Sequence, residues 1–133
     1  MRCDHFDAGT CHSCSLLPQP YELQLAGKVE AVAATLSPVP GADEIAWLAP
    51  ASSPENGFRT SAKLVVGGTR RRPTLGILGP DRRGVDLPGC PIQHPAINRA
   101  TPGLKRFIRS LDLTPYDVPT KRGELKNILI TVG

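Results

Sequence analysis

The chain has four cysteines, and their positions restrict how it can fold. Three lie in the first fourteen residues and the fourth lies far downstream, at Cys3, Cys11, Cys14 and Cys90. All four are in polar segments rich in glycine and proline, whereas cysteines that serve as small apolar side chains are usually buried on helices or strands. If the four act together, the start of the chain is held against a loop in its middle.

Thiolates bind zinc or iron–sulfur clusters, and both kinds of site take about four of them. The spacing, C-x7-C-x2-C with a distant C-P, differs from the compact ferredoxin run and from the two CxxC pairs of a zinc ribbon. The residues alone favour a metal centre without choosing between zinc and a cluster. The alternatives are a disulfide, or a buried Cys90 beside an isolated CxxC. His5, His12 and His94 lie near the cysteines and are candidate substitute ligands, although we expect them to be solvated bystanders.

A length of 133 residues and an apolar content of 40 % predict one domain with one modest core. Fourteen prolines and thirteen glycines indicate many turns and few helices. No run of 18 apolar residues is present, and the first residues lack the pattern of a secretory signal. We therefore expect a cytoplasmic protein with no membrane span, in a compartment where disulfides are rare.

The order of patterns predicts a small α+β domain. Residues 1–19 have little periodicity and read as a Cys-rich loop that needs an external constraint. Apolar residues at spacings of three and four predict a helix from Pro20 to about Leu36. Ile45 to Leu48 is expected to start a sheet. Two runs, Lys63 to Val66 and Thr74 to Leu78, are joined by a glycine-rich loop and predict a hairpin.

Two further elements are expected in the second half of the chain. Pro102 to about Leu111 reads as a helix with Thr101 as its N-cap. The β-branched content of Asn127 to Val132 predicts a last strand. The expected fold is thus a small antiparallel sheet with two main helices (residues 20–133) and an amino-terminal loop held by a metal cluster.

The positive charge of the chain makes a polyanion a reasonable partner, although a charge of this size is more often only a solvated surface. The net charge is +4, with Arg70 to Arg72 adjoining and further cations in the last thirty residues. Aromatic residues are scarce, so a base-stacking platform is not expected. The three adjoining arginines are interpreted as a solvated loop.

Several motifs, taken in order, resemble the amino-terminal part of the 23S ribosomal RNA uracil-C5 methyltransferases. The likeness covers all 133 residues and is closest to the branch without a preceding small β-barrel domain. The motifs are Cys3-x7-Cys11-x2-Cys14, Pro54-Glu-Asn-Gly-Phe58-Arg59-Thr-Ser-Ala-Lys63-Leu-Val-Val, Leu75-Gly-Ile-Leu, Cys90-Pro-Ile, Leu113-Thr-Pro-Tyr-Asp-Val and Lys121-Arg-Gly-Glu-Leu-Lys-Asn-Ile-Leu-Ile.

The resemblance implies that Cys3, Cys11, Cys14 and Cys90 ligate a [4Fe-4S] cluster in an accessory domain, residues 1–133, that helps to grip 23S rRNA. It implies RNA contacts at Arg59, Lys63, Lys121, Arg122 and Lys126, for which a solubilising sheet face is the alternative. Family enzymes transfer a methyl group from S-adenosylmethionine, using a catalytic cysteine that adds to a flipped-out uracil. The carboxy-terminal domain that binds this cofactor has no counterpart here, and we assign no catalytic residue.

We therefore expect a monomeric fragment of a methyltransferase that does not methylate RNA by itself. S-adenosylmethionine would be a cofactor of the full-length enzyme only. The alternative is a stand-alone protein that binds zinc, or that carries an iron–sulfur cluster for electron transfer.

Overall fold

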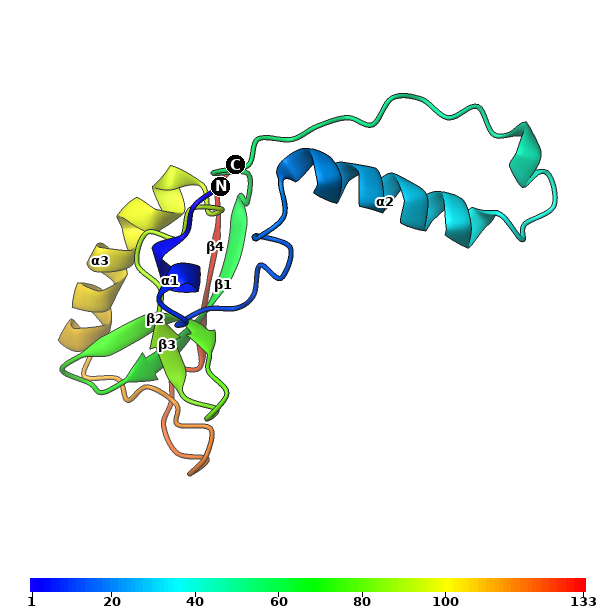
Figure 1. Cartoon of the computed structure of the whole chain (residues 1–133). Coiled ribbons are helices and arrows are strands. Elements are labelled where there is room, and N and C mark those ends of the chain that lie inside the picture. The colour runs from blue at the N-terminus through cyan, green and yellow to red at the C-terminus, as the bar shows by residue number, and fades with distance from the viewer.

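The computed structural model describes all residues, 1–133, and has an α+β fold built on one four-stranded antiparallel sheet of order β3-β2-β1-β4 (Figure 1). The expected fold class, a small antiparallel sheet with two main helices, is confirmed. The elements are α1 (Asp4–Asp7), α2 (Tyr21–Leu36), a 3₁₀ turn η1 (Ala42–Glu44), β1 (Ser61–Gly68), β2 (Pro73–Leu78), β3 (Gly84–Asp86), α3 (Pro95–Ser110) and β4 (Asn127–Thr131).

The hydrophobic core lies between the sheet and α3. Side chains alternate between the two faces of a strand, so Ala62, Leu64 and Val66 of β1 all point to the same side, and all three are buried. Ile97 and Ile108 of α3 pack against them. The helix therefore covers one face of the sheet, while Lys63, on the other face of β1, is exposed.

The predicted hairpin and the predicted last strand are both confirmed. β1 pairs with β2 on one side, with Val66 opposite Leu75, and with β4 on the other, with Leu64 opposite Ile128. Ile128 and Ile130 of β4 extend the core. Leu129, between them, faces away from the core and is 73 % exposed.

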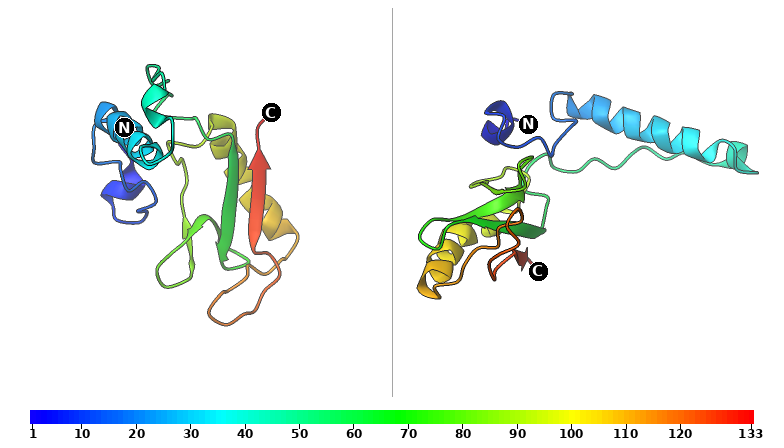
Figure 2. Two further views of the ribbon diagram at one scale, coloured as in Figure 1. Left: turned by 90° about the vertical axis from the view of Figure 1, so that its right-hand side faces the viewer. Right: turned by 90° about the horizontal axis from the view of Figure 1, so that it is seen from below.

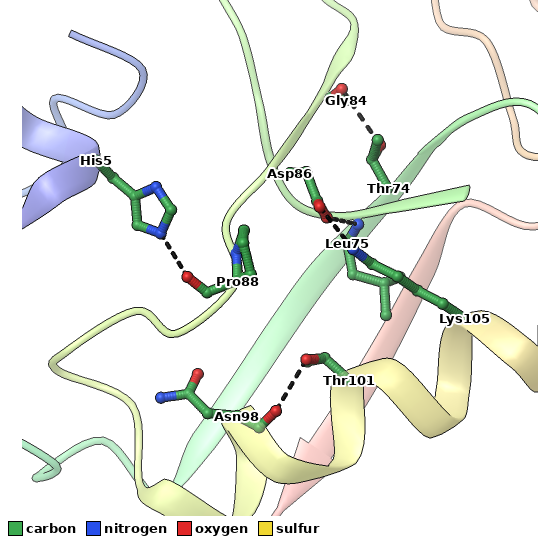
Figure 3. Close-up of polar contacts among 9 residues, drawn as sticks. All are labelled: His5, Thr74, Leu75, Gly84, Asp86, Pro88, Asn98, Thr101 and Lys105. Atoms are coloured by element: carbon green, nitrogen blue, oxygen red, sulfur yellow. Dashed lines mark hydrogen bonds and ion pairs between the residues drawn. The ribbon is translucent and has the colours of Figure 1, made fainter. Parts of the chain in front are cut away.

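Strand β3 was not predicted, because residues 79–89 read as a loop. Glycines let it approach the hairpin closely: a Cβ on Gly67 would lie 2.6 Å from the Cα of Gly84. Asp86 then joins β3 to its neighbours, since one carboxylate oxygen accepts a hydrogen bond from the Leu75 N–H at 2.8 Å and the other binds the Lys105 ammonium of α3 at 2.6 Å (Figure 3).

Helix α3 starts earlier than predicted, and the expectation that Thr101 is its N-cap is wrong. The helix begins at Pro95 with His94 as its cap, and Pro102 lies inside it. A proline inside a helix has no N–H for the carbonyl four residues earlier, here that of Asn98. The buried Thr101 hydroxyl donates to this carbonyl at 2.9 Å instead (Figure 3). A side chain thus replaces the backbone bond that Pro102 removes.

Helix α2 agrees with the prediction, but none of its residues is buried. Figures 1 and 2 show that it extends away from the sheet and that a long connection brings the chain back. The strand expected at Ile45 to Leu48 is wrong, because this segment forms no ladder and Trp47 is 50 % exposed. Pro50 and Pro54, which cannot donate ladder hydrogen bonds, follow it closely.

The role of Thr101 predicts a specific stability effect. Thr101→Val keeps the side-chain shape but removes the hydroxyl, so the Asn98 carbonyl loses its donor, and we expect the free energy of unfolding to fall by about 1–3 kcal/mol. Pro102→Ala restores a backbone N–H to this carbonyl, so Thr101→Val should cost clearly less in a Pro102→Ala background. Urea unfolding of the four proteins measures both costs, and equal costs would contradict this role.

Candidate metal centre

The first cysteines are arranged by one turn of helix that was not predicted within residues 1–19. The Cys3 carbonyl accepts hydrogen bonds from the N–H groups of Phe6 and Asp7, at 3.0 and 2.9 Å, and so starts α1. After the turn, the Cys11 N–H donates to the His5 carbonyl at 3.0 Å. The chain thus reverses within eight residues, and Cys11 returns toward Cys3.

Two long-range contacts hold this segment on the rest of the protein. The Nε2 atom of His5 lies 2.7 Å from the Pro88 carbonyl oxygen, which makes a hydrogen bond to the loop that carries Cys90 (Figure 3). The amino-terminal ammonium of Met1 pairs with Glu55 at 2.9 Å. The expectation that the start of the chain lies against a loop in the middle is therefore confirmed.

The loop of Cys90 is itself fixed from two sides. Asn98, in the first turn of α3, donates from Nδ2 to the Cys90 carbonyl at 3.0 Å. On the other side, the Gly57 N–H donates to the Pro91 carbonyl and the Arg59 N–H to the Ile92 carbonyl, both at 2.9 Å. Cys90 is therefore held between α3 and the segment that leads into β1.

All four cysteines line one small cavity, of about 20 Å³. Its remaining lining is mainly apolar and includes Phe6, Leu87 and Ile92. Cys3 is buried, and the other three cysteines are half-buried. The fold thus brings together four residues that are up to 87 positions apart in the sequence.

The thiols are close enough to affect one another's ionisation. Burial raises the pKa of the Cys14 thiol, and the neighbouring thiolates of Cys90, Cys11 and Cys3 raise it further, while the nearby Arg59 guanidinium lowers it. Burial also raises the pKa of the Cys90 thiol, against hydrogen bonds from the backbone of Ile92 and Gln93. Four thiolates in one apolar cavity repel one another, and a bound cation relieves this repulsion.

A zinc ion and an iron–sulfur cluster require different distances between the four cysteine sulfurs. No three histidine, cysteine, aspartate or glutamate side chains are arranged to hold a single metal ion. A tetrahedral zinc ion with bonds of about 2.3 Å would draw its sulfur ligands to about 3.8 Å from one another. A cluster of several irons takes one thiolate on each corner and holds the sulfurs further apart. Four thiolates are the donor set of both kinds of centre, so the donors themselves suit either.

The three histidines have other surroundings. His5 reaches the cavity, but its Nε2 is bonded to the Pro88 carbonyl. The exposed ring of His12 packs edge-on against Phe6. His94 caps α3, since its Nδ1 accepts a hydrogen bond from the Ala96 N–H at 3.2 Å. The tethering role of His5 could not be predicted from local sequence, because Pro88 lies 83 positions away.

The five cations predicted to bind RNA are all exposed, but they do not form one group. Arg59 lies beside the Cys90 loop, at the start of β1, and Lys63 lies opposite Leu129 on the open face of the sheet. Lys121 and Arg122 belong to the loop before β4. The Lys126 ammonium lies 4.3 Å from the centre of the Tyr116 ring.

Known proteins resemble this chain over its whole length, although no family model matches it. It is 44 % identical over 131 residues, 98 % of its length, to the 23S rRNA (uracil(747)-C(5))-methyltransferase RlmC of Enterobacter sp. (strain 638). It is 44 % identical over 133 residues, 100 % of its length, to the protein of the same name from Halothiobacillus neapolitanus. It is also 44 % identical over 131 residues to that of Yersinia pestis (strain Pestoides F).

In each case the chain covers 34 % of the relative, so it spans about a third of the length of these curated proteins. None of its helices has the length and apolar character needed to cross a membrane. The resemblance seen in the ordered motifs is confirmed by these matches over 98–100 % of the chain. Over its whole length the chain is therefore similar to about one third of the length of proteins that are named 23S rRNA (uracil-C5)-methyltransferases.

Proposed function

We propose that this chain is the amino-terminal, iron–sulfur and RNA-holding part of a 23S rRNA uracil-C5 methyltransferase that uses S-adenosylmethionine. The observation that carries the proposal is the convergence of all four cysteines on one apolar cavity. The relatives that match the whole chain are named as methyltransferases of this kind. An iron–sulfur centre fits the thiolate donors, and the relatives' name supplies the reaction.

In this proposal Cys3, Cys11, Cys14 and Cys90 each bind one iron of a [4Fe-4S] cluster. The cluster would supply a covalent tie between residues 1–19 and the loop after β3. The protein prepares this tie through the bonds of His5 to Pro88 and of Asn98 to Cys90. The cluster would thus strengthen a contact between two segments that these hydrogen bonds already hold together.

No cysteine of this chain lies outside the cavity, so none is free to attack the uracil. We therefore assign the methyl transfer, and the binding of S-adenosylmethionine, to the part of the family proteins that this chain does not span. The chain's own part is to contact the RNA through exposed cations. We propose Arg59, Lys63, Lys121, Arg122 and Lys126 for this role.

The nature of the metal centre is tested by purifying the chain without oxygen. We expect a brown protein with about four irons and four acid-labile sulfides per chain, because four thiolates are the usual ligand set of such a cluster. Metal and sulfide analysis together with the visible absorption spectrum measures this. Stoichiometric zinc without sulfide would reject the cluster and favour a zinc-binding protein. A cluster that cycles readily at physiological potentials would favour electron transfer.

Removal of one ligand tests whether the cluster ties the two segments together. Cys90→Ser should lose the iron and also speed hydrogen exchange of the amides in residues 1–19 by about tenfold or more, because metal-ligand energy is folding energy in small domains. The Cys11 amide, which donates to His5, is a good reporter.

Ser13→Ala is the matched control, since it alters the amino-terminal Cys-rich segment beside Cys14 and removes no thiolate. It should keep the iron and the slow exchange. If Cys90→Ser lost its iron and residues 1–19 exchanged at the wild-type rate, the structural role of the cluster would be excluded.

A further inference from the structure

Three loops that are far apart in the sequence lie against one another. They are the β1–β2 tip (residues 69–72), the β2–β3 turn (79–83) and the segment before β4 (112–124), and we call them together the three-loop surface. Figure 1 shows the turn, in yellow-green, and the segment before β4, in orange, at the lower end of the molecule. The close approach of Gly84 to Gly67 brings this turn beside the end of β1.

The three-loop surface contains two adjoining hollows. One, of about 500 Å³, is lined by Arg70, Arg71 and Arg122, and Pro115 is its one apolar side chain. The other, of about 250 Å³, is lined by Arg82 and Arg83. Gly68, Thr69, Pro115 and Asp117 line both. Arginines from all three loops therefore border one continuous depression.

Most of the positive charge on this surface is not neutralised. Seven cations stand on the three loops: Arg70, Arg71, Arg72, Arg82, Arg83, Lys121 and Arg122. Only Arg70 forms an ion pair, with Asp112 at 2.8 Å. The other six have no carboxylate partner within 4 Å.

The remaining carboxylates hold the loops in shape. Asp117 accepts hydrogen bonds from the N–H and hydroxyl of Thr120, at 3.0 and 2.6 Å, and these bonds lower the pKa of its carboxyl. Asp81 accepts from the backbone N–H of Arg83 at 3.0 Å, and Glu124 accepts from that of Thr114 at 3.0 Å. The acidic groups thus fix the backbone and leave the guanidinium groups available.

The backbone of two of these cations is a second, independent observation. Arg82 has φ 61° and Lys121 has φ 57°, in the left-handed region where glycine is the unstrained residue. They are two of the three non-glycine residues of the chain in this region, and the third is Asp112, the partner of Arg70. Backbone strain of this kind gathers at functional sites. At two turns, a charged side chain stands where the backbone favours glycine.

We propose that the three-loop surface binds the phosphate backbone of RNA. This inference rests on the proposed function and extends it, since it adds Arg71, Arg72, Arg82 and Arg83 to the predicted Lys121 and Arg122. Six of the seven cations are arginines, whose planar forks bind phosphate oxygens in pairs. No large apolar side chain lines the larger hollow, so it offers nothing to insert into a bilayer, and RNA fits better than an anionic membrane.

The double variant Arg82→Gly, Lys121→Gly tests this. Glycine accepts the left-handed backbone, so the variant should unfold at the same temperature as the wild type or higher. Binding to a hairpin transcript of 23S rRNA should weaken, and the slope of log affinity against log salt should fall by about 0.7 for each phosphate that the protein no longer neutralises. Fluorescence anisotropy over a series of salt concentrations measures both quantities.

The matched control is Lys28→Gln, Arg99→Gln, which removes two exposed positive charges from α2 and α3. It should keep most of the affinity and the wild-type slope. Equal weakening in the control and in the glycine variant would overturn the surface in favour of general charge. Wild-type binding that the glycine variant fully retains would overturn the surface alone and leave the proposed function standing.

A wild-type chain that did not bind the transcript would remove the RNA-holding role, and with it this surface. Anionic vesicles, of phosphatidylglycerol and phosphatidylcholine in equal parts, are the competing probe. If the wild type bound these vesicles and not the RNA, and the glycine variant bound neither, a membrane would replace RNA as the partner.

Discussion

The packing of α3 on the sheet is the constraint on which both the core and the cysteine cavity depend. Ile97 and Ile108 fill the core between this helix and β1. Asn98, the residue after Ile97, donates a hydrogen bond to the Cys90 carbonyl, and Lys105 of the same helix binds Asp86 of β3. A shift of the helix would therefore move the fourth cysteine and the strand before it together. The geometry of the cysteine cavity is a consequence of the hydrophobic core.

The parts of the fold that were predictable are those whose side chains follow one local period. β1 and β4 place alternate residues in the core, and α2 has a regular helical pattern, so each was found from its sequence. Pro102 interrupted the pattern of α3 and concealed its first two turns. The hydrogen bond from Thr101 to Asn98 that makes a proline acceptable there depends on a side-chain rotamer, which periodicity does not report. Trp47 illustrates the reverse error, since an apolar run without a partner strand does not form a sheet.

The candidate metal centre likewise has parts that could be predicted from the sequence and parts that could not. The four cysteines could be chosen from residue type and from their loop context, because thiolates in polar, glycine-rich segments suit few roles. The tether from His5 to Pro88 spans 83 positions and leaves no trace in the local sequence. The three-loop surface was missed for a related reason. It forms because Gly67 of β1 and Gly84 of β3 approach each other closely, and no charge pattern along the chain indicates that approach.

The surroundings of Arg59 differ from those of the other cations, because this arginine lies beside the cysteine cavity. Its guanidinium is the one neighbour that lowers the pKa of Cys14, which burial and the three other cysteines raise. Apart from Arg70, which pairs with Asp112, the arginines of the three loops have no carboxylate partner within 4 Å. The other carboxylates of these loops accept hydrogen bonds from backbone and hydroxyl donors. The positive charge of the chain is therefore divided between an arginine beside the cysteine cavity and a larger group on the three loops, where every cation except Arg70 lacks a carboxylate partner.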